Sequence, residues 1–222
     1  ALYQMLKERL QQKGFLAYFN SDCGQLSQIA RIAEEEASWA GIYLGMGASW
    51  RLDRKQLGVL KQLCIWRERV ARERDKPRTW IARDADLIEL AEKRPADRAA
   101  LMQLKELSKN LYQQDASTIL AVIATSEAVS AQDAARVDGL PLSPDQRQLL
   151  KRCQQQIEKI ASETGIAVEL LARKKLLVQL IHLNTGLEKG ADLHWPEALE
   201  SAWQRPVIEQ GLRAALQHGI SA

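Results

Sequence analysis

The sequence predicts an all-α protein built from two small helical-bundle domains. Apolar residues recur at helical spacing along nearly the whole chain, and no stretch alternates as a half-buried strand does. The chain has 222 residues, which is enough for one large domain or two small ones. A stretch rich in Ser, Gly and Pro, at about residues 129–144, indicates a linker between two helical halves.

Six helices are predicted before this linker, at about residues 2–13, 24–40, 54–75, 86–91, 97–107 and 115–128. Gly14 is the expected stop of the first helix, because glycine readily adopts the left-handed conformation that follows a helix. Asp53 precedes the long third helix, and Asp84 is expected to cap the fourth, with Pro95 after its end. The run Glu34–Glu36 falls mostly off the apolar face of the second helix, so we expect it to be solvated.

Four helices are predicted after the linker, at about residues 145–163, 167–183, 196–203 and 205–217. The first of these has clear signals at both ends. Ser143 is a favourable N-cap, and Pro144 suits the first helical position because its fixed backbone angle is already helical. Gly165 is the expected end of the same helix.

The chain also repeats itself at an offset of 90 residues. Ten residues are identical to the residue 90 positions later: Gln56, Leu60, Lys61, Glu68, Ala71, Glu73, Ala82, Arg83, Leu87 and Leu90. Two amphipathic helices in phase would share some of these. The match continues across the break at residues 75–83, however, and this indicates a duplicated helical module.

The first long helix and the segment after it are strongly basic. Residues 51–83 hold eleven Lys or Arg against four Asp or Glu, a local charge of +7 in a chain whose net charge is +3. Phosphates recur along a nucleic acid, so a long cationic face suits that ligand. The alternative is a solvated face on which Arg and Glu pair at helical spacing. The candidate nucleic-acid-binding residues are Lys55, Lys61, Arg69, Arg72, Lys76, Arg78 and Arg83.

Three large side chains in the same segment have an expected structural role. Helical spacing predicts a buried apolar stripe on the long helix, formed by Leu57, Leu60, Leu63, Cys64, Val70 and Ala71. Arg67 lies near the centre of this stripe, so we expect it to form an ion pair with an acidic side chain, Asp84 or Asp86. Trp80 is expected in the core. Trp66 is expected to pack against the preceding segment, although an exposed Trp on a basic surface would instead stack on bases.

No catalytic or metal-binding motif is found. The segment Gly45–Gly47 lacks the Lys-Ser/Thr that completes a phosphate-binding loop, and none of the three histidines has a second ligand at helical spacing. The three cysteines are odd in number and far apart, so we expect neither a disulfide framework nor a zinc site, and a cytoplasmic location. No apolar run reaches about 18 residues, so no membrane span is predicted. The expected role is binding or positioning, without a cofactor of its own.

Part of the chain resembles the HRDC domain, the helicase and ribonuclease D C-terminal module. The resemblance is carried by Trp66-Arg67-Glu68, Ala71-Arg72, Asp75, Pro77, Leu87, Leu90-Ala91 and Pro95. Gln114-Asp115 departs from the pattern, because HRDC domains often have Gly there. Residues 143–220 resemble the degenerate second HRDC domain of the ribonuclease D family.

The front of the chain resembles the same family. Residues 3–10 look like the last helix of the ribonuclease D exonuclease domain, and residues 47–52 look like the lead-in to its first HRDC domain. The resemblance thus implies the C-terminal region of a bacterial ribonuclease D. Its expected parts are 1–48, the last exonuclease helices and a connector; 49–130, the first HRDC domain; 131–142, a linker; and 143–222, the second, degenerate HRDC domain.

The resemblance implies a 3′–5′ exoribonuclease that trims tRNA precursors and other structured RNA with two divalent metal ions, Mg²⁺ or Mn²⁺. The acidic motifs of that activity would lie upstream of Ala1, so no catalytic residue is assigned in this chain. We expect the chain to bind RNA and to contact its missing exonuclease domain, with no membrane contact. The alternatives are a structural protein–protein interaction module and the HRDC pair of a RecQ-type DNA helicase. Residues 3–10 do not favour the helicase, because a helicase would have different residues before its HRDC domain.

Overall fold

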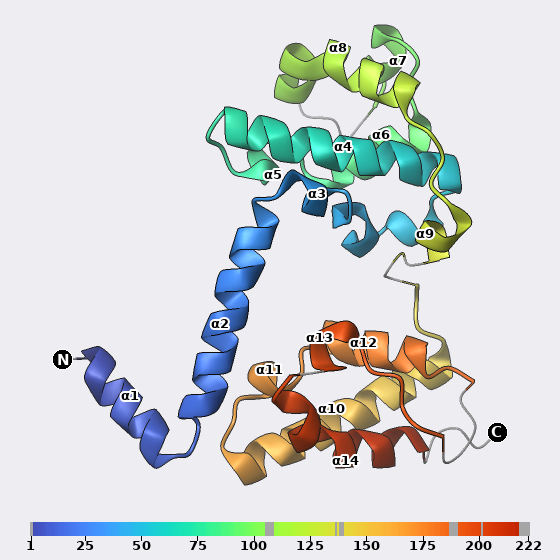
Figure 1. Ribbon diagram of the computed structural model, residues 1–222. Helices are drawn as coiled ribbons and strands as arrows, with labels where there is room; N and C mark the ends of the chain where they lie inside the picture. The colour runs from blue at the N-terminus through green and yellow to red at the C-terminus, as the bar shows by residue number, and fades with distance from the viewer. Residues whose placement is uncertain are drawn as a thin grey trace. The chain divides into compact units, whose positions relative to one another are not determined.

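The computed structural model describes residues 2–104, 109–135, 137, 140–186, 191–200 and 202–217, and every regular element among them is helical (Figure 1). The predicted all-α class is therefore confirmed for this part of the chain. The elements are α1 (Leu2–Gln12), α2 (Leu16–Ala33), α3 (Glu36–Trp39), the 3₁₀ turns η1 (Ile42–Gly45) and η2 (Ser49–Arg51), α4 (Arg54–Glu73), α5 (Arg78–Ile81), α6 (Asp84–Lys93), α7 (Arg98–Met102), α8 (Lys109–Thr125), α9 (Ala131–Ala135), α10 (Pro144–Thr164), α11 (Val168–Leu171), α12 (Lys174–Leu183), α13 (Glu197–Glu200) and α14 (Gln204–Gln217).

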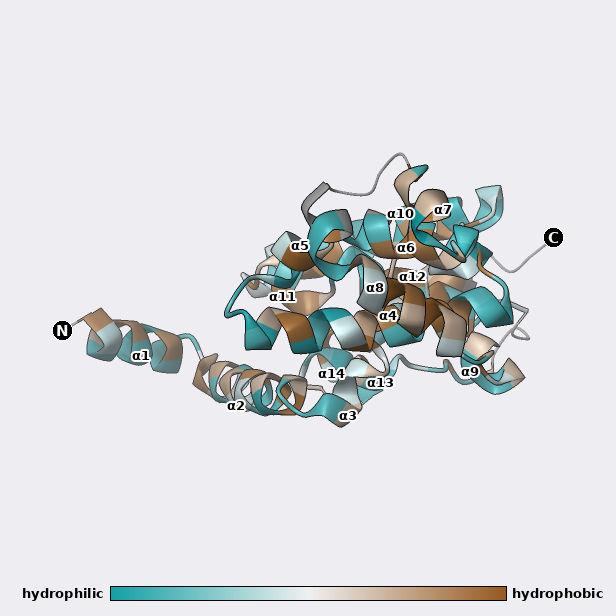
Figure 2. Cartoon of the chain, turned by 90° about the horizontal axis from the view of Figure 1, so that it is seen from above, coloured by the Kyte–Doolittle hydropathy of each residue, from teal (hydrophilic) through white to brown (hydrophobic). Residues whose placement is uncertain are grey.

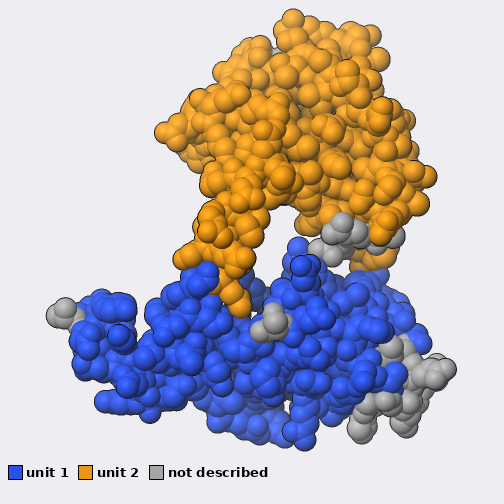
Figure 3. All heavy atoms as spheres, viewed as in Figure 1, with its two compact units in different colours: residues 1–24, 141–222 blue, residues 25–140 orange. Residues whose placement is uncertain are grey.

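The chain forms two compact units (Figure 3). One unit holds residues 25–140, and the other holds residues 1–24 together with 141–222. This division differs from the four parts expected from the sequence, because residues 25–48 join the first helical module. The expected linker also contains α9, which packs against α4. Each unit has its own hydrophobic core.

Helix α4 is the centre of the unit 25–140. Asp53 caps it: the Asp53 carboxylate accepts from the Gln56 backbone N–H, and the Gln56 side chain accepts from the Asp53 N–H, both at 2.8 Å. Helices α6 and α8 pack against α4. The apolar stripe predicted on this helix is buried in full: Leu57, Leu60, Leu63, Cys64, Val70 and Ala71.

Helix α10 has the same position in the other unit. Ser143 and Gln146 form its capping box, Pro144 is its first residue, and Gly165 ends it in the left-handed region at φ 71°, all as predicted. Helices α12 and α14 pack against it. The core of this unit is built around Cys153 and Ile157, which are completely buried.

The 90-residue repeat extends to the backbone. Helices α10, α11 and α12 follow in the order of α4, α5 and α6, and each begins 90 residues after its counterpart. The residues that link the last two helices, Ala82 and Ala172, are both extended, with φ of −154° and −158°. The duplicated module predicted from the sequence is confirmed at the level of these helices.

Several predicted boundaries are wrong. The helix expected at 24–40 is α2, which begins at Leu16 and ends at Ala33, and none of its residues is buried. The helix expected at 167–183 is divided into α11 and α12, because the buried, extended Ala172 interrupts it. Asp84 is the first residue of α6 and Arg83 is its N-cap. The helix expected at 97–107 is α7, which ends at Met102, and the helix expected at 115–128 is α8, which begins at Lys109. Residues 105–107 of the first of these lie outside the described residues.

Candidate nucleic-acid interface

Two of the predicted RNA-binding arginines on α4 are paired with carboxylates. Arg69 forms an ion pair with Glu36. Arg72 donates from Nε to Glu34 Oε2 and from Nη1 to Glu68 Oε2, each at 2.9 Å. The acidic run is exposed, as expected, but it also has partners that the sequence did not predict. The chain turns after α2, and this turn brings two of the three glutamates against α4.

Arg72 connects the segment before α4 to the helix itself. Its guanidinium lies 4.5 Å from the centroid of the Trp39 ring and donates to the Ala33 carbonyl at 2.9 Å. The hydrogen bonds to Glu68 and then Glu34 raise the pKa of Arg72 above its ordinary value. Because this side chain already has several partners, the structure gives it a clear packing role.

Two more cations of the basic segment donate hydrogen bonds to other groups of the same chain. Lys55 donates to the Ser126 carbonyl. Arg74 forms a two-pronged pair with Asp115, at 2.9 Å and 2.6 Å. Asp115 belongs to the Gln-Asp sequence that departs from the HRDC pattern, so this departure has a structural counterpart. Lys61 is half-buried, and no carboxylate of the described residues pairs with it.

Arg67 has the role predicted for it. Its side chain is only 1% exposed, and Nη1 donates to Asp84 Oδ1 at 2.6 Å and to the Ala82 carbonyl at 3.1 Å. Trp66 is buried, as expected for a packing residue. Both residues therefore belong to the structural interior of the module.

The segment after α4 presents the outward cations. We define the α5 surface as Lys76, Arg78, Trp80 and Arg83. Lys76 is exposed and has no ion-pair partner in the part of the chain that the structure describes. Arg78 is 56% exposed and lies 3.5 Å from Glu68, while Arg83 is 53% exposed and donates to the buried Asp86 at 2.7 Å. All three remain accessible to a ligand.

The location predicted for Trp80 from the sequence is wrong. It was expected in the core, but it is 75% exposed. Helix α5 has only four residues, and its inward side is already filled by Ile81 and Ala82, which are 6% and 2% exposed. The corresponding residue of the second module, Leu170, is also exposed, at 53%, so both modules place an outward apolar residue here. The sequence alone contains no signal for this, because an apolar residue at both repeat positions is equally typical of a core.

Within the described residues, no group of three or more His, Cys, Asp or Glu is arranged to hold a metal ion. No helix in the same residues is long and apolar enough to cross a membrane. The α5 surface is therefore the candidate site, and it can bind an anion and offer a flat aromatic face.

A comparison with protein families supports the HRDC resemblance of the first module. Residues 56–123 match the family model described as the HRDC domain. This match covers α4, α5 and α6, and hence the α5 surface. It does not extend to the second copy of the module.

The chain is also similar to about half of each of several ribonucleases D. It is 28% identical to ribonuclease D of Pseudomonas paraeruginosa over 216 residues, or 97% of this chain and 55% of that protein. It is 29% identical to ribonuclease D of Serratia proteamaculans over 215 residues, covering 96% and 55%. The chain thus spans about half the length of the curated relatives it matches.

A solved structure has the same fold. The crystal structure of Escherichia coli RNase D, "an exoribonuclease involved in structured RNA processing", matches with a TM-score of 0.69. The match covers 98% of this chain and 56% of that one, at 24% sequence identity. It extends across both compact units, including the second copy that the family model does not reach.

Proposed function

We propose that this chain is the RNA-binding and positioning region of a ribonuclease D-like 3′–5′ exoribonuclease that acts in tRNA 3′-end processing. The similarity to ribonucleases D along almost the whole chain supports this class. Cleavage would be carried out by a part of the protein outside these residues, with two divalent ions, Mg²⁺ or Mn²⁺. On its own the chain should not trim RNA in either metal. A RecQ-type helicase is not favoured by these relatives.

The observation that carries the proposal is the exposed indole of Trp80 among three accessible cations. Burying an indole stabilises a fold, so an indole left 75% exposed has little structural value. Every base has a flat π-face on which an aromatic side chain can stack, and each phosphate can accept from one Lys or Arg. The α5 surface combines both kinds of contact and would bind single-stranded RNA with little sequence preference.

The seven candidate cations differ in how readily they could contact RNA, because some of them already have partners within the protein. We propose Lys76, Arg78 and Arg83 as direct phosphate contacts, and Lys61 as a further one. Arg69 and Arg72 would reach RNA only by exchanging their carboxylate partners for phosphates. Lys55 would have to leave a backbone carbonyl, so we place it last.

The test compares two tryptophan variants in binding to a short, labelled single-stranded RNA, measured by fluorescence anisotropy. Trp80→Ala should weaken binding about ten-fold, because base–aromatic stacking contributes roughly 1–3 kcal/mol per base. Trp50→Ala is the matched control, because Trp50 is 40% exposed and lies outside the α5 surface. Equal losses in the two variants, or no binding by the unmodified chain, would contradict the proposal.

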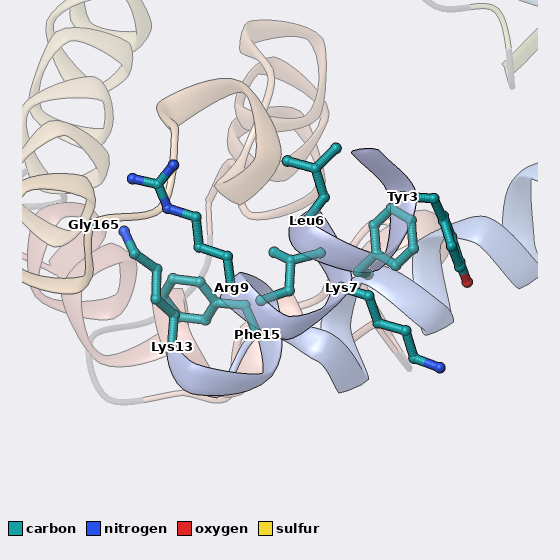
Figure 4. Close-up of a pocket in the computed structure, with 9 residues that line it drawn as sticks. Tyr3, Leu6, Lys7, Arg9, Lys13, Phe15 and Gly165 are labelled. Atoms are coloured by element: carbon teal, nitrogen blue, oxygen red, sulfur yellow. The ribbon is translucent and has the colours of Figure 1, made fainter. Parts of the chain in front are cut away.

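An interaction role is the second candidate, and a different observation favours it. Helix α1 has no buried residue, and its apolar side chains Leu2, Tyr3, Met5 and Leu6 are 46–69% exposed. In Figure 2 this helix carries both hydrophobic (brown) and hydrophilic (teal) residues. Leu6 also lines a cavity of about 370 Å³, together with Arg9 of α1, Lys13 just after the helix, and Gly165 (Figure 4). We propose that α1 packs against the exonuclease part of a longer protein. Its amides should then exchange hydrogen more slowly in that protein than in this chain; equal exchange would contradict the packing.

A cytoplasmic location accords with the cysteines. Cys64 and Cys153 are buried in separate cores and form no disulfide. Buried thiols of this kind are typical of a reducing compartment. We therefore propose that the protein acts in the cytoplasm, where tRNA precursors are found.

A further inference from the structure

A buried carboxylate lies beside one of the arginines of the α5 surface. It belongs to Glu68 of α4, whose side chain is only 8% exposed. Its two oxygens face different arginines: Oε2 accepts from Arg72 Nη1 at 2.9 Å, and Oε1 lies 3.5 Å from Arg78 Nη1. One buried glutamate is thus shared between an arginine of α4 and an arginine of the α5 surface.

The turn between α4 and α5 makes this contact possible. Asp75 has a φ of 48°, in the left-handed region that aspartate adopts more readily than most residues. The Lys76 N–H donates to the Ala71 carbonyl at 2.9 Å, where α4 ends. Helix α5 then packs against α4, and Arg78 comes to lie beside a residue ten positions earlier. The tertiary fold therefore fixes the place of this guanidinium.

Folding needs only the first of the two arginine contacts. A buried carboxylate requires a partner, and Arg72 provides one at hydrogen-bond distance. The contact with Arg78 is longer, and the Arg78 side chain is 56% exposed, so this ion pair adds little to stability. Its effect is to orient an exposed guanidinium. The contact involves Nη1, so Nε and Nη2 can still donate to a phosphate.

The second module provides a comparison for this arrangement. The residue 90 positions after Glu68 is Glu158, which is exposed. That module has no arginine at either partner position, where its residues are Ser162 and Val168. The helical module therefore folds without a buried glutamate between two arginines. The arrangement occurs in the module that has the exposed indole of Trp80, and this points to a role in ligand binding.

We propose that Glu68 is a positioning residue for RNA: it orients Arg78 towards a phosphate beside the base that stacks on Trp80. This inference rests on the proposed function. A mobile arginine loses side-chain freedom when it binds a phosphate, whereas an oriented one has lost part of that freedom on folding. Glu68 thus strengthens RNA binding, although its own negative charge repels RNA.

The test is the direction in which affinity changes when this negative charge is removed. Glu68→Gln keeps the size of the side chain, and by charge alone it would strengthen binding. If Glu68 positions Arg78, binding of the whole chain to a short single-stranded RNA should instead weaken about three-fold. Glu158→Gln is the matched control, with the same change of charge at the corresponding exposed position, and it should bind as tightly as the unmodified chain or slightly more tightly.

A double-mutant cycle shows whether the effect passes through Arg78. In the Arg78→Ala background, Glu68→Gln should no longer weaken binding, because no guanidinium remains to be oriented. A merely structural role would weaken binding equally in both backgrounds, and that result would overturn the inference.

A second variant keeps the charge and decides the case if Glu68→Gln does not fold. Glu68→Asp withdraws the carboxylate by one methylene group, so it should weaken binding by a similar factor at unchanged net charge. If the unmodified chain binds RNA and Trp80→Ala weakens binding, but neither Glu68 variant binds more weakly than Glu158→Gln, the inference is overturned and the proposed function stands. If the unmodified chain binds no RNA, both are overturned.

Discussion

At the scale of single residues, Arg67 is the most unusual side chain of the first module. It is buried, its partner Asp84 is 64% exposed on the side chain, and its Nε has no hydrogen-bond partner. A buried charge that loses its partner is costly, whereas replacing the charge by an apolar group of similar size is often neutral. The second module has made this replacement at Ile157.

This comparison leads to a prediction for two variants. Asp84→Ala should lower the free energy of unfolding by about 2–3 kcal/mol, because it leaves the guanidinium buried with one carbonyl. Arg67→Met should change it by less than about 1.5 kcal/mol, since the buried charge is removed with little change of volume. Urea denaturation measures both. Equal losses would contradict the view that the ion pair balances a charge rather than stabilising the fold.

The buried thiol of Cys64 leads to a prediction about pH. Burial raises the pKa of this thiol from 9.0 to about 12, and Arg67 opposes the shift. The folded state therefore favours the protonated thiol. This stability is fully present below about pH 9 and is lost as pH rises from 9 towards 12. Urea denaturation at pH 7.5 and at pH 10 should show a smaller loss for Cys64→Ala than for the unmodified chain; identical losses would contradict the assignment.

At the scale of the helix, Gly58 lets the segment after α8 cross α4. A Cβ atom at this position would lie 1.7 Å from the carbonyl oxygen of Glu127. Two residues after Glu127, Val129 exchanges hydrogen bonds with Arg54: the Val129 N–H donates to the Arg54 carbonyl at 3.0 Å, and Arg54 Nε donates to the Val129 carbonyl at 2.8 Å. The backbone of Glu127 therefore cannot move away without breaking these bonds.

Gly58→Ala should destabilise the fold by about 2–3 kcal/mol, because the added methyl group collides with backbone. The matched control is Gly24→Ala in α2, where nothing lies within 4 Å of the added Cβ. The control should be neutral or stabilise by roughly 0.5–1 kcal/mol, since alanine is the better helix former. Thermal unfolding measures both. A stable Gly58→Ala variant would show that the crossing is looser than described.

The acidic turn between α2 and α3 gives a second prediction at this scale. Glu34 and Glu36 are paired with Arg72 and Arg69. Glu34→Gln/Glu36→Gln should strengthen binding to single-stranded RNA a few-fold, because two arginines become available to phosphates. Anisotropy titration at low salt measures the change. Unchanged or weaker binding would remove Arg69 and Arg72 from the proposed interface.

At the scale of the whole molecule, the sequence was sufficient for the helical class, the apolar stripe of α4 and the repeat. These depend on periodicity and caps, which are local: Asp53 and Ser143 mark helix starts wherever the helices pack. The sequence was not sufficient to predict that Trp80 is exposed or that Glu34 pairs with Arg72, because both outcomes depend on tertiary contacts. A hydrophobic residue in a four-residue helix faces inward or outward according to what its neighbours already fill, and the reach of the acidic turn to α4 depends on where α2 ends.

The central claim is that this chain holds a sugar–phosphate polymer through accessible cations, and salt dependence tests it most directly. We count four proposed phosphate contacts, at Lys61, Lys76, Arg78 and Arg83. At about 0.7 per contact for a single strand, log affinity against log salt should have a slope of about −2.8. Lys76→Ala/Arg78→Ala/Arg83→Ala should reduce its magnitude to about 0.7. A flat salt response of the unmodified chain would contradict the account.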